Sequence, residues 1–492
     1  MQNNGGLKMK PPIYNGLMKY ISKQRIQFTY PGHKGKVRMR ADTLCKFDTP
    51  ILEDTDDISN PKGCIAESEN VMADIYGSGR CMYLSGGVNA GIYALLAATC
   101  NAGDKVIVDP ECGKAIINAI TMLALIPVFI LRSYNAKYDI RGGISTDELY
   151  SVTGDNSDAK AMIITSPTYY GVCTNIRKAA EITHDRGIML FVDESQGAHF
   201  NFSDNLPESA IMCGADAVVQ SCGETLGAFP GSGLLHLCSG ALHPENVREQ
   251  LNMIQSGSDS RSMLCALENA VFYAFDNSKK MNLILKELER GREIINSRSD
   301  ILWFANEYNN GCNIDITDPT KIVLNFKRMS ISAADAAKIL INKYGIEPLS
   351  YDNSNIVFSV SLYNNPAEIR KLINSCISIS KLVSSAPAAA NEPNDIFENE
   401  SAGEERITVN TLPYKAFYCS GEKISYEGAS GRICRKCVYV NPQTVPVIVP
   451  GEKITAYHID KISEIISCGG NIGGLDENGC VDVLTLSDSF YY

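Results

Sequence analysis

The sequence lacks a long apolar run. No stretch approaches the roughly 20 residues that a membrane-spanning helix needs, and residues 1–10 are polar where a secretory signal would be apolar. Blocks of basic residues are absent too, as is any alternation of basic with aromatic residues, so nucleic acid is not an expected partner. We therefore expect a cytoplasmic protein that binds neither membranes nor nucleic acids.

Cysteine is plentiful, but its spacing excludes a disulfide framework. The 17 cysteines are spread irregularly over 492 residues, which fits reduced thiols in the cytoplasm. Hydrophobic residues make up 45% and charged residues 21% of the chain, as in ordinary globular proteins. A net charge of −11 would suit a cationic substrate, but solubility explains it better.

Short β-branched runs alternate with helical stretches from about residue 80 to 240. Because these runs are apolar throughout and separated by helices, they predict an α/β fold with a mostly parallel sheet covered on both faces. The expected strands are 105–109, 127–131, 161–166, 188–193, 217–221 and 234–237, and the expected helices are 90–100, 114–125 and 176–186.

Polar residues end four of these expected strands. In an open parallel sheet the ligand site lies beyond the carboxyl ends of the strands. Asp109, Ser166, Asp193 and Ser221 occupy those ends. The sequence therefore predicts that their side chains lie near a common site.

The rest of the chain predicts further units. Residues 1–80 are expected to lead into a major domain at 81–275, followed by a smaller α+β subdomain at 276–385. Alanine, proline, asparagine, glutamate and serine dominate the segment 386–405, which is typical of a linker. Apolar content returns at 406–492, where we expect a small C-terminal α+β domain.

Eight motifs follow one another along the chain. They are YPGHKG at 30–35, DDISNPKG at 56–63, SPTYYGV at 166–172, VDESQGAHF at 192–200, LPESA at 206–210, GADAVVQS at 214–221, GASGRI at 428–433 and VPVIVPGE at 445–452. In this order they resemble the ornithine/lysine/arginine decarboxylases of the pyridoxal-phosphate (PLP) fold-type I class, in their short bacterial form. The resemblance implies the aspartate aminotransferase-like fold, PLP as the family cofactor and decarboxylation of basic amino acids.

Some family positions are kept. The resemblance places Asp193 opposite the pyridinium nitrogen of the cofactor, where an electron sink needs a charge partner. His199 and Ser221 also match family residues. A purely structural role for His199, behind the sheet, is the alternative to a role in the site.

Other family positions are changed, above all the lysine that would form an imine with PLP. That position is Glu224, and a carboxylate can neither form an imine nor favour an anionic cofactor. The other changes are Gly223 for the preceding histidine, Gly113 for the ring-stacking histidine, Gly86-Gly87-Val88-Asn89 for the phosphate-binding Gly-Gly-Ser-Thr turn, Gln196 for the histidine of Asp-Glu-Ala-His, and Ser258-Asp259-Ser260-Arg261 for Ser-Pro-Ser-Tyr.

Four other candidate sites each have a structural explanation beside the functional one. Lys114 could replace the lost lysine, but a covalent role demands a particular geometry. Cys434 and Cys437 form a CxxC without a second pair of zinc ligands at suitable spacing. A Cys222 nucleophile with His199 as its base, and a Glu194–Glu224 acid–base pair, are further alternatives that nothing in the spacing requires.

The leading hypothesis is a catalytically degenerate homologue with a structural, regulatory or ligand-binding role, in which PLP binding is not expected. The alternatives are an active PLP-dependent decarboxylase of arginine, lysine or ornithine in polyamine metabolism, and an enzyme that works without PLP. The resemblance implies a homodimer or higher oligomer, or a heteromer with an active relative. A basic amino acid or polyamine is the expected ligand, and no metal is expected.

Overall fold

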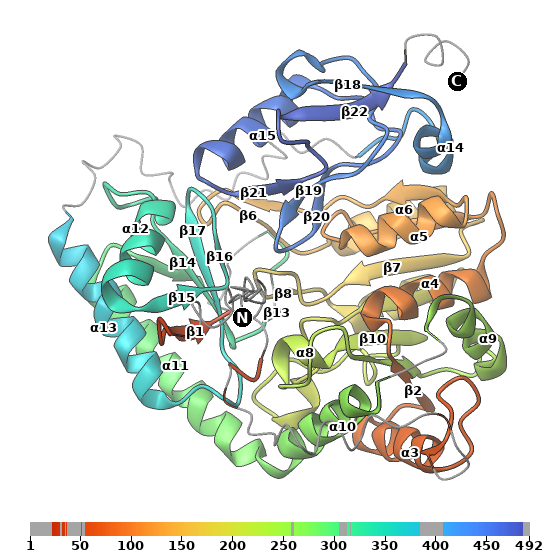
Figure 1. Ribbon diagram of the computed structural model, residues 1–492, viewed down its shortest axis with the longest axis horizontal. Coiled ribbons are helices and arrows are strands. Elements are labelled where there is room, and N and C mark those ends of the chain that lie inside the picture. The colour runs from red at the N-terminus through yellow and green to blue at the C-terminus, as the bar shows by residue number, and fades with distance from the viewer. Residues whose placement is uncertain are drawn as a thin grey trace, which may run out of the picture.

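The computed structural model describes residues 22–29, 32–34, 36, 51, 55–256, 260–304, 312–314, 316–383 and 407–485. They form a large α/β unit, a smaller unit built on a four-stranded sheet, and a C-terminal α+β unit (Figure 1). The expected linker at 386–405 lies outside the described residues, as do Ser258 and Asp259.

A seven-stranded sheet forms the centre of the large unit. The five strands from β10 to β4 are parallel, and β11 runs antiparallel to both of its neighbours. The expectation of a mostly parallel sheet is confirmed, and all six strands expected there are present. The order across the sheet is β2 (Arg80–Leu84), β11 (Gly233–Leu237), β10 (Ala217–Ser221), β9 (Met189–Asp193), β7 (Ala161–Thr165), β3 (Lys105–Val108) and β4 (Ile126–Phe129).

Both faces of this sheet are buried. Alternate strand residues such as Ile107 and Val192 belong to one hydrophobic core, whereas Val106 and Phe191 belong to a second core on the other face. This explains why the strands read as continuous apolar runs. Helices α4 (Gly87–Thr99), α5 (Lys114–Met122) and α9 (Pro244–Ile254) cover the second face, and α3 (Cys64–Tyr76), α6 (Thr146–Asp155), α7 (Ile176–His184) and α10 (Arg261–Asp276) cover the first.

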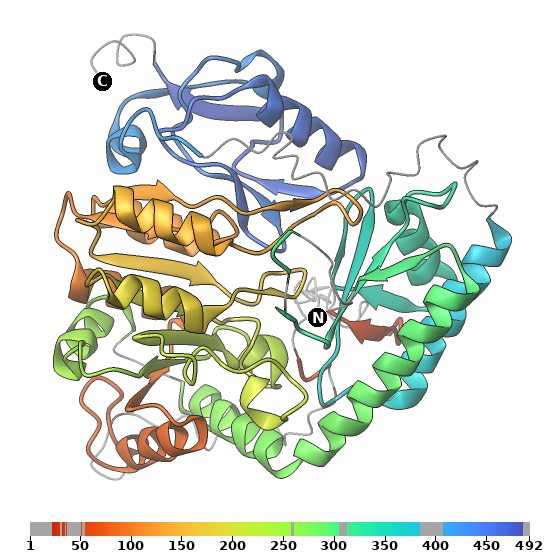
Figure 2. The same ribbon diagram turned by 180° about the vertical axis from the view of Figure 1, so that it is seen from behind.

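The smaller unit contains an antiparallel sheet in the order β12 (Leu302–Phe304), β14 (Lys321–Asn325), β17 (Asn355–Ser359) and β16 (Ser350–Tyr351). The long helix α11 (Ser278–Arg298) runs from the large unit and packs along α13 (Pro366–Leu382) (Figure 2). Its other elements are α12 (Ala333–Ile339), the helical turn Leu340–Tyr344 and β15 (Ile346–Pro348), which pairs with β1 (Ile26–Phe28).

Several short elements complete the two units. They are the hairpin β5 (Tyr134–Asn135) and β6 (Ile140–Arg141), the pair β8 (Val172–Cys173) and β13 (Ile316–Thr317), the 3-10 turn Phe200–Phe202, and α8 (Cys222–Thr225). β8 belongs to the large unit, whereas β13 leads directly into β14 of the smaller unit. The hydrogen bonds between β8 and β13 therefore connect the two units.

One turn of the C-terminal unit contacts both other units. Thr444 O accepts a 2.8 Å hydrogen bond from Lys114 N, and Gln443 Nε2 donates to Ser350 Oγ at 3.2 Å. Its elements are α14 (Pro413–Tyr418), β18 (Gly421–Ser425), the 3-10 turn Tyr426–Gly428, β19 (Val438–Asn441), β20 (Val445–Ile448), α15 (Ala456–Ser467), β21 (Asn471–Gly473) and β22 (Cys480–Leu484).

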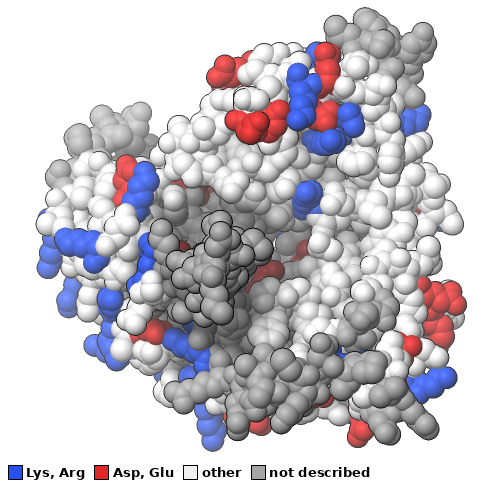
Figure 3. All heavy atoms as spheres, viewed as in Figure 1, with Lys and Arg blue, Asp and Glu red and all other residues white. Residues whose placement is uncertain are grey.

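The described surface fits the absence of a basic patch in the sequence. On the face in Figure 3, Lys and Arg side chains are dispersed, with Asp and Glu side chains among them. Within the described ranges, every helix is too short or too polar to cross a membrane.

Candidate functional site

The carboxyl ends of the parallel strands meet at one edge of the sheet, as expected. Asp193, the last residue of β9, stands in register with Thr165 of β7 and Val219 of β10. Ser166 N donates a 3.1 Å hydrogen bond to Asp193 O across the same edge. Asp193 and Ser221 are both buried there, which brings two of the expected site residues into one place.

Asp109 directly follows β3 at this edge, but its side chain makes its contacts in the interior of the protein. Its carboxylate accepts hydrogen bonds from Arg132 Nε at 2.8 Å and Nη2 at 2.6 Å, and from Thr165 N at 3.0 Å. Both side chains of the Asp109–Arg132 pair have no exposed surface. The polar end of this strand therefore anchors neighbouring chain segments and does not face a ligand.

Asp193 is already engaged within the chain. Ser195 N donates to its Oδ1 at 3.1 Å, and the hydroxyl of Ser195 donates to the same oxygen. Burial raises the pKa of Asp193, although these two hydrogen bonds lower it. One carboxylate oxygen of the residue that the resemblance places opposite the pyridinium nitrogen thus has local partners of its own.

Glu224 takes part in a chain of three polar side chains. It is partly buried on α8, and its Oε2 accepts a hydrogen bond from Gln196 Nε2. Gln196 Oε1 accepts a 2.6 Å hydrogen bond from Lys321 Nζ, and Lys321 is the first residue of β14 in the smaller unit. Gln196 therefore links an acid of the large unit to an amine of the smaller unit.

The two ionisable groups of this chain shift in opposite directions. Burial raises the pKa of Glu224 to about 7; Asp193 adds to the rise, while Lys321 and a hydrogen bond from Ser221 oppose it. Burial lowers the pKa of Lys321 to about 8, although the negative charges of Asp318 and Glu224 act to raise it. Each group is held closer to its neutral form than it would be in water.

The stability of the protein is expected to depend on pH through Glu224. The pKa of Glu224 in the folded state is about 7, above the ordinary value of 4.5. Between pH 4.5 and about pH 7 the folded state therefore binds more protons than the unfolded state. The free energy of unfolding should therefore fall as pH rises through that window, by up to about 3 kcal/mol. Glu224→Gln should show a smaller fall, because only Glu194, whose pKa burial also raises to about 7, would still contribute one of this size; urea unfolding at about pH 5 and about pH 7.5 would measure the difference. Equal pH dependence in both proteins would contradict the assignment.

The backbone around α8 leaves no room for the family's histidine before the lysine position. A Cβ atom added at Gly223 would lie 2.8 Å from Phe229 O and 3.1 Å from Pro230 Cα. A Cβ atom at Gly32 would lie 2.8 Å from Glu224 O. Close backbone packing thus explains the glycine at 223, which the sequence shows only as a departure.

The turn that replaces the phosphate-binding turn is capped by the side chain of Gln255, the residue that follows α9. Gln255 Oε1 accepts hydrogen bonds from Ser85 N at 2.7 Å and Gly86 N at 3.2 Å. Gly87, Val88 and Asn89 follow as the first turn of α4. None of these three side chains supplies a hydroxyl, so the turn offers an anion few donors beyond its backbone.

The ring-stacking position faces the C-terminal unit. A Cβ atom added at Gly113 would lie 3.4 Å from Thr444 Oγ1. Lys114 turns towards the same unit, with Nζ 4.2 Å from the centre of the Tyr439 ring. Lys114 is therefore engaged in a cation–π contact, and nothing brings it to Glu224 as a substitute amine.

His199 lies where the two units meet. Its Nε2 is 3.1 Å from Thr320 Oγ1 and 3.4 Å from Asp318 Oδ1, and the residue is buried. His199 and Lys321 hold the pKa of Asp318 below its usual value although burial alone would raise it. These contacts favour the structural role of His199.

The remaining alternatives find structural explanations. Cys222, Cys434 and Cys437 are buried, and burial raises the pKa of each thiol, so they stay protonated. Glu194 accepts hydrogen bonds from Ser209, Ala210 and Gln220, all within the core. Among the described residues, no group of three or more metal-ligating side chains occurs.

Sequence reasoning missed Lys321, Lys34 and Gln255. Lys34 is buried, and its Nζ donates to Thr29 O at 2.5 Å and Ser359 O at 3.0 Å. Burial, followed by the nearby charge of Lys321, lowers the pKa of Lys34 well below its usual value. The available signal for Lys321 was its place directly before the apolar run 322–324, whereas nothing in the sequence marks Gln255.

Comparisons with known proteins agree with the fold. The constitutive lysine decarboxylase of Escherichia coli superposes with a TM-score of 0.72 at 18% identity, covering 97% of this chain and 82% of that one. Lysine decarboxylase LdcF of Francisella novicida gives 0.72 at 15% identity, covering 96% and 84%. An alanine–glyoxylate aminotransferase from Nostoc sp. gives 0.54 at 13% identity over 72% of this chain and 95% of that one. The expected PLP fold-type I class is confirmed.

Sequence relatives extend over almost the whole chain. The arginine decarboxylase of Bacillus subtilis is 27% identical over 475 residues, which are 95% of this chain and 96% of that protein. A family model described as the major domain of Orn/Lys/Arg decarboxylases matches residues 11–347. The chain therefore belongs to the Orn/Lys/Arg decarboxylase family.

Proposed function

We propose that this chain is a catalytically degenerate member of its family that does not bind PLP and serves a structural or regulatory role. The observation that carries the proposal is the chain of hydrogen bonds from Glu224 through Gln196 to Lys321. An acid stands where the family forms an imine, and it is held there by partners of its own. Removal of a covalent nucleophile typically costs several orders of magnitude in rate.

Three contacts that PLP would need are made within the chain instead. Gln255 accepts from the backbone donors at Ser85 and Gly86, Ser195 donates to one carboxylate oxygen of Asp193, and Gln196 donates to Glu224. To enter, the cofactor would have to displace each of them. Losing a neutral hydrogen bond costs about 1 kcal/mol, so the chemistry of these residues does not fit PLP.

A homodimer or higher oligomer is the proposed assembly, with an active relative as an alternative partner. The polyamine or basic amino acid considered as a ligand is less well supported by the site. The amine of Lys321 already acts as a positive charge on Glu224, so part of the negative charge at the site is offset within the chain. Thermal shift with putrescine, cadaverine, agmatine and arginine tests this point, because a ligand of the folded state raises its stability.

The test of the main proposal is addition of PLP to the purified protein. We expect no visible absorption band of a coenzyme imine, no pyridoxyl-lysine after borohydride reduction, and no carbon dioxide from arginine, lysine or ornithine. An arginine decarboxylase from Bacillus is the positive control. Coenzyme-dependent release of carbon dioxide by this protein would establish the alternative, an active decarboxylase.

A further inference from the structure

A cavity of about 360 Å³ lies between the large unit and the smaller unit. Tyr170 and residues 204–207 line it from the large unit, and residues of α11, of β12 and of the segment 316–321 line it from the other side. Glu224 does not belong to its described lining, although Lys321 borders both places. The cavity is therefore a separate place from the position that lost its lysine.

The walls of the cavity are mostly apolar and include the single tryptophan of the chain. Leu285 and Leu288 lie three residues apart on α11, so they share the face that lines the cavity. Trp303, Phe304 and Leu206 join them, and these five residues have only 3–9% of their surface exposed. A space of this size with such walls suits an apolar ring or chain of about six to eight carbon atoms.

Asp318 brings a buried carboxylate to the same cavity. Its Oδ1 accepts hydrogen bonds from Thr320 N at 2.8 Å and Thr320 Oγ1 at 2.7 Å, and lies 3.4 Å from His199 Nε2. Its Oδ2 is also buried, yet it has no hydrogen-bond partner in the part of the chain that the structure describes. A carboxylate oxygen buried without a donor is costly, so a ligand that brings an N–H group to Asp318 would be favoured.

The other charges of the lining also favour a cation. Asp204 is exposed at the rim and makes no ion pair or hydrogen bond among the described residues. The positive groups, in contrast, already have partners. Arg292 Nη2 lies 2.6 Å from Glu289 Oε1, and Lys321 is held by the hydrogen bond described above. Asp204 and Asp318 are therefore the acids that a bound cation would meet.

We propose that this cavity binds a small organic monoamine, with its ammonium group at Asp318 and its apolar body between α11 and Trp303. The ammonium group would donate to the oxygen that lacks a partner, and a charged donor gives the stronger hydrogen bond. A diamine or a basic amino acid is disfavoured, because its second charged group would lose its hydration among apolar side chains. A carboxylate is disfavoured by Asp318 and Asp204.

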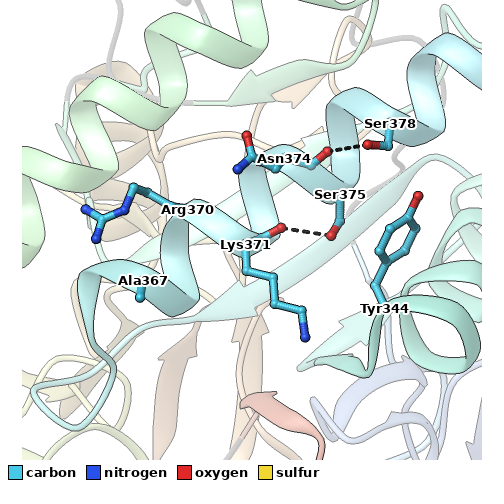
Figure 4. Close-up of a pocket in the computed structure, with 7 residues that line it drawn as sticks. All are labelled: Tyr344, Ala367, Arg370, Lys371, Asn374, Ser375 and Ser378. Carbon is cyan, nitrogen blue, oxygen red and sulfur yellow. Dashed lines mark hydrogen bonds between the residues drawn. The ribbon is translucent and has the colours of Figure 1, made fainter.

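A second hollow, of about 390 Å³, lies along α13 of the smaller unit and does not suit the same ligand (Figure 4). Arg370 and Lys371 line it, and none of its described lining residues is an acid. Its hydroxyls at Ser375 and Ser378 donate within α13, to Lys371 O and Asn374 O. An ammonium group would meet only positive charges there, so the buried acid distinguishes the cavity between the units.

Tryptophan fluorescence reports on the cavity alone, because Trp303 is the single tryptophan of the 492 residues. The full chain is titrated with 2-phenylethylamine, with 2-phenylethanol as the uncharged analogue and 3-phenylpropanoate as the anionic one. We expect a saturable change with the amine, at a Kd at least about tenfold lower than that of the alcohol. The carboxylate, putrescine and arginine should leave the fluorescence unchanged up to about 10 mM.

Variants test the two acids separately. Asp318→Asn should abolish the preference for the amine over the alcohol. Asp204→Asn removes a rim charge that has no partner within the chain, and it should weaken binding of the amine about two- to threefold. Asp74→Asn, at an exposed acid of α3 outside the cavity, is the control and should change nothing. If Asp318→Asn does not fold, the ligand series and Asp204→Asn still decide the question.

The outcomes do not depend on whether PLP binds, because the proposed function concerns Glu224 and is tested by the visible band of the coenzyme. Equal affinity for the amine and the alcohol, or no change with the amine up to about 10 mM, would overturn monoamine binding. Putrescine bound as tightly as 2-phenylethylamine would overturn the need for an apolar body. A rise in thermal stability with the amine, but not with the alcohol, in the same preparation would support the site.

Discussion

Replacing Glu224 with lysine is expected to destabilise the protein by about 3–5 kcal/mol and to leave it colourless when PLP is added. The new ammonium group would stand near Lys321, and Gln196 Nε2 would lose its acceptor. Two amines close together in a poorly solvated site repel each other. Restoring the family's residue therefore does not restore the family's site.

Urea unfolding and visible absorption measure the two parts of this expectation. Glu224→Met is the matched control, because it removes the acid without adding a positive charge, and it should lose less stability than the lysine variant. Adding Gln255→Ala to the lysine variant frees Ser85 N and Gly86 N. A lysine variant that is yellow with PLP, and at least as stable as the original chain, would show that the pocket is otherwise intact.

The strand pattern was readable from the sequence because the sheet is buried on both faces. Parallel strands such as β7 and β9 are short apolar runs that end in a polar residue. The convergence of Asp193 and Ser221 at one edge follows from the same pattern. Glu224 was also identified from the sequence, since its place in the motif needs no knowledge of the fold.

The partners of these residues could not be predicted in the same way. Lys321 reaches Gln196 only because the smaller unit folds back onto the strand ends, and no local pattern encodes that contact. Gln255 caps the start of α4 because α9 packs along α4. Long-range packing of this kind determines whether a changed residue leaves a gap or gains a new partner.

The buried Asp109–Arg132 pair is where the second large effect is expected. Asp109→Asn should lower the free energy of unfolding by about 3–5 kcal/mol, because it leaves the guanidinium buried without its counter-charge. The pair has two short contacts, at 2.8 and 2.6 Å, and neither side chain is exposed. Asp109 Oδ2 also holds Thr165 N, so the substitution disturbs the strand that precedes Ser166.

A surface pair provides the control for this prediction. Arg177 and Glu208 make a contact of similar length, 2.8 Å, but their side chains are 57% and 53% exposed. Arg177→Ala should therefore change stability by no more than about 1 kcal/mol. Urea unfolding of both variants under one set of conditions compares them. If Asp109→Asn lost no more stability than Arg177→Ala, the polar end of β3 would not be a structural anchor, and a role for Asp109 towards a ligand would have to be reconsidered.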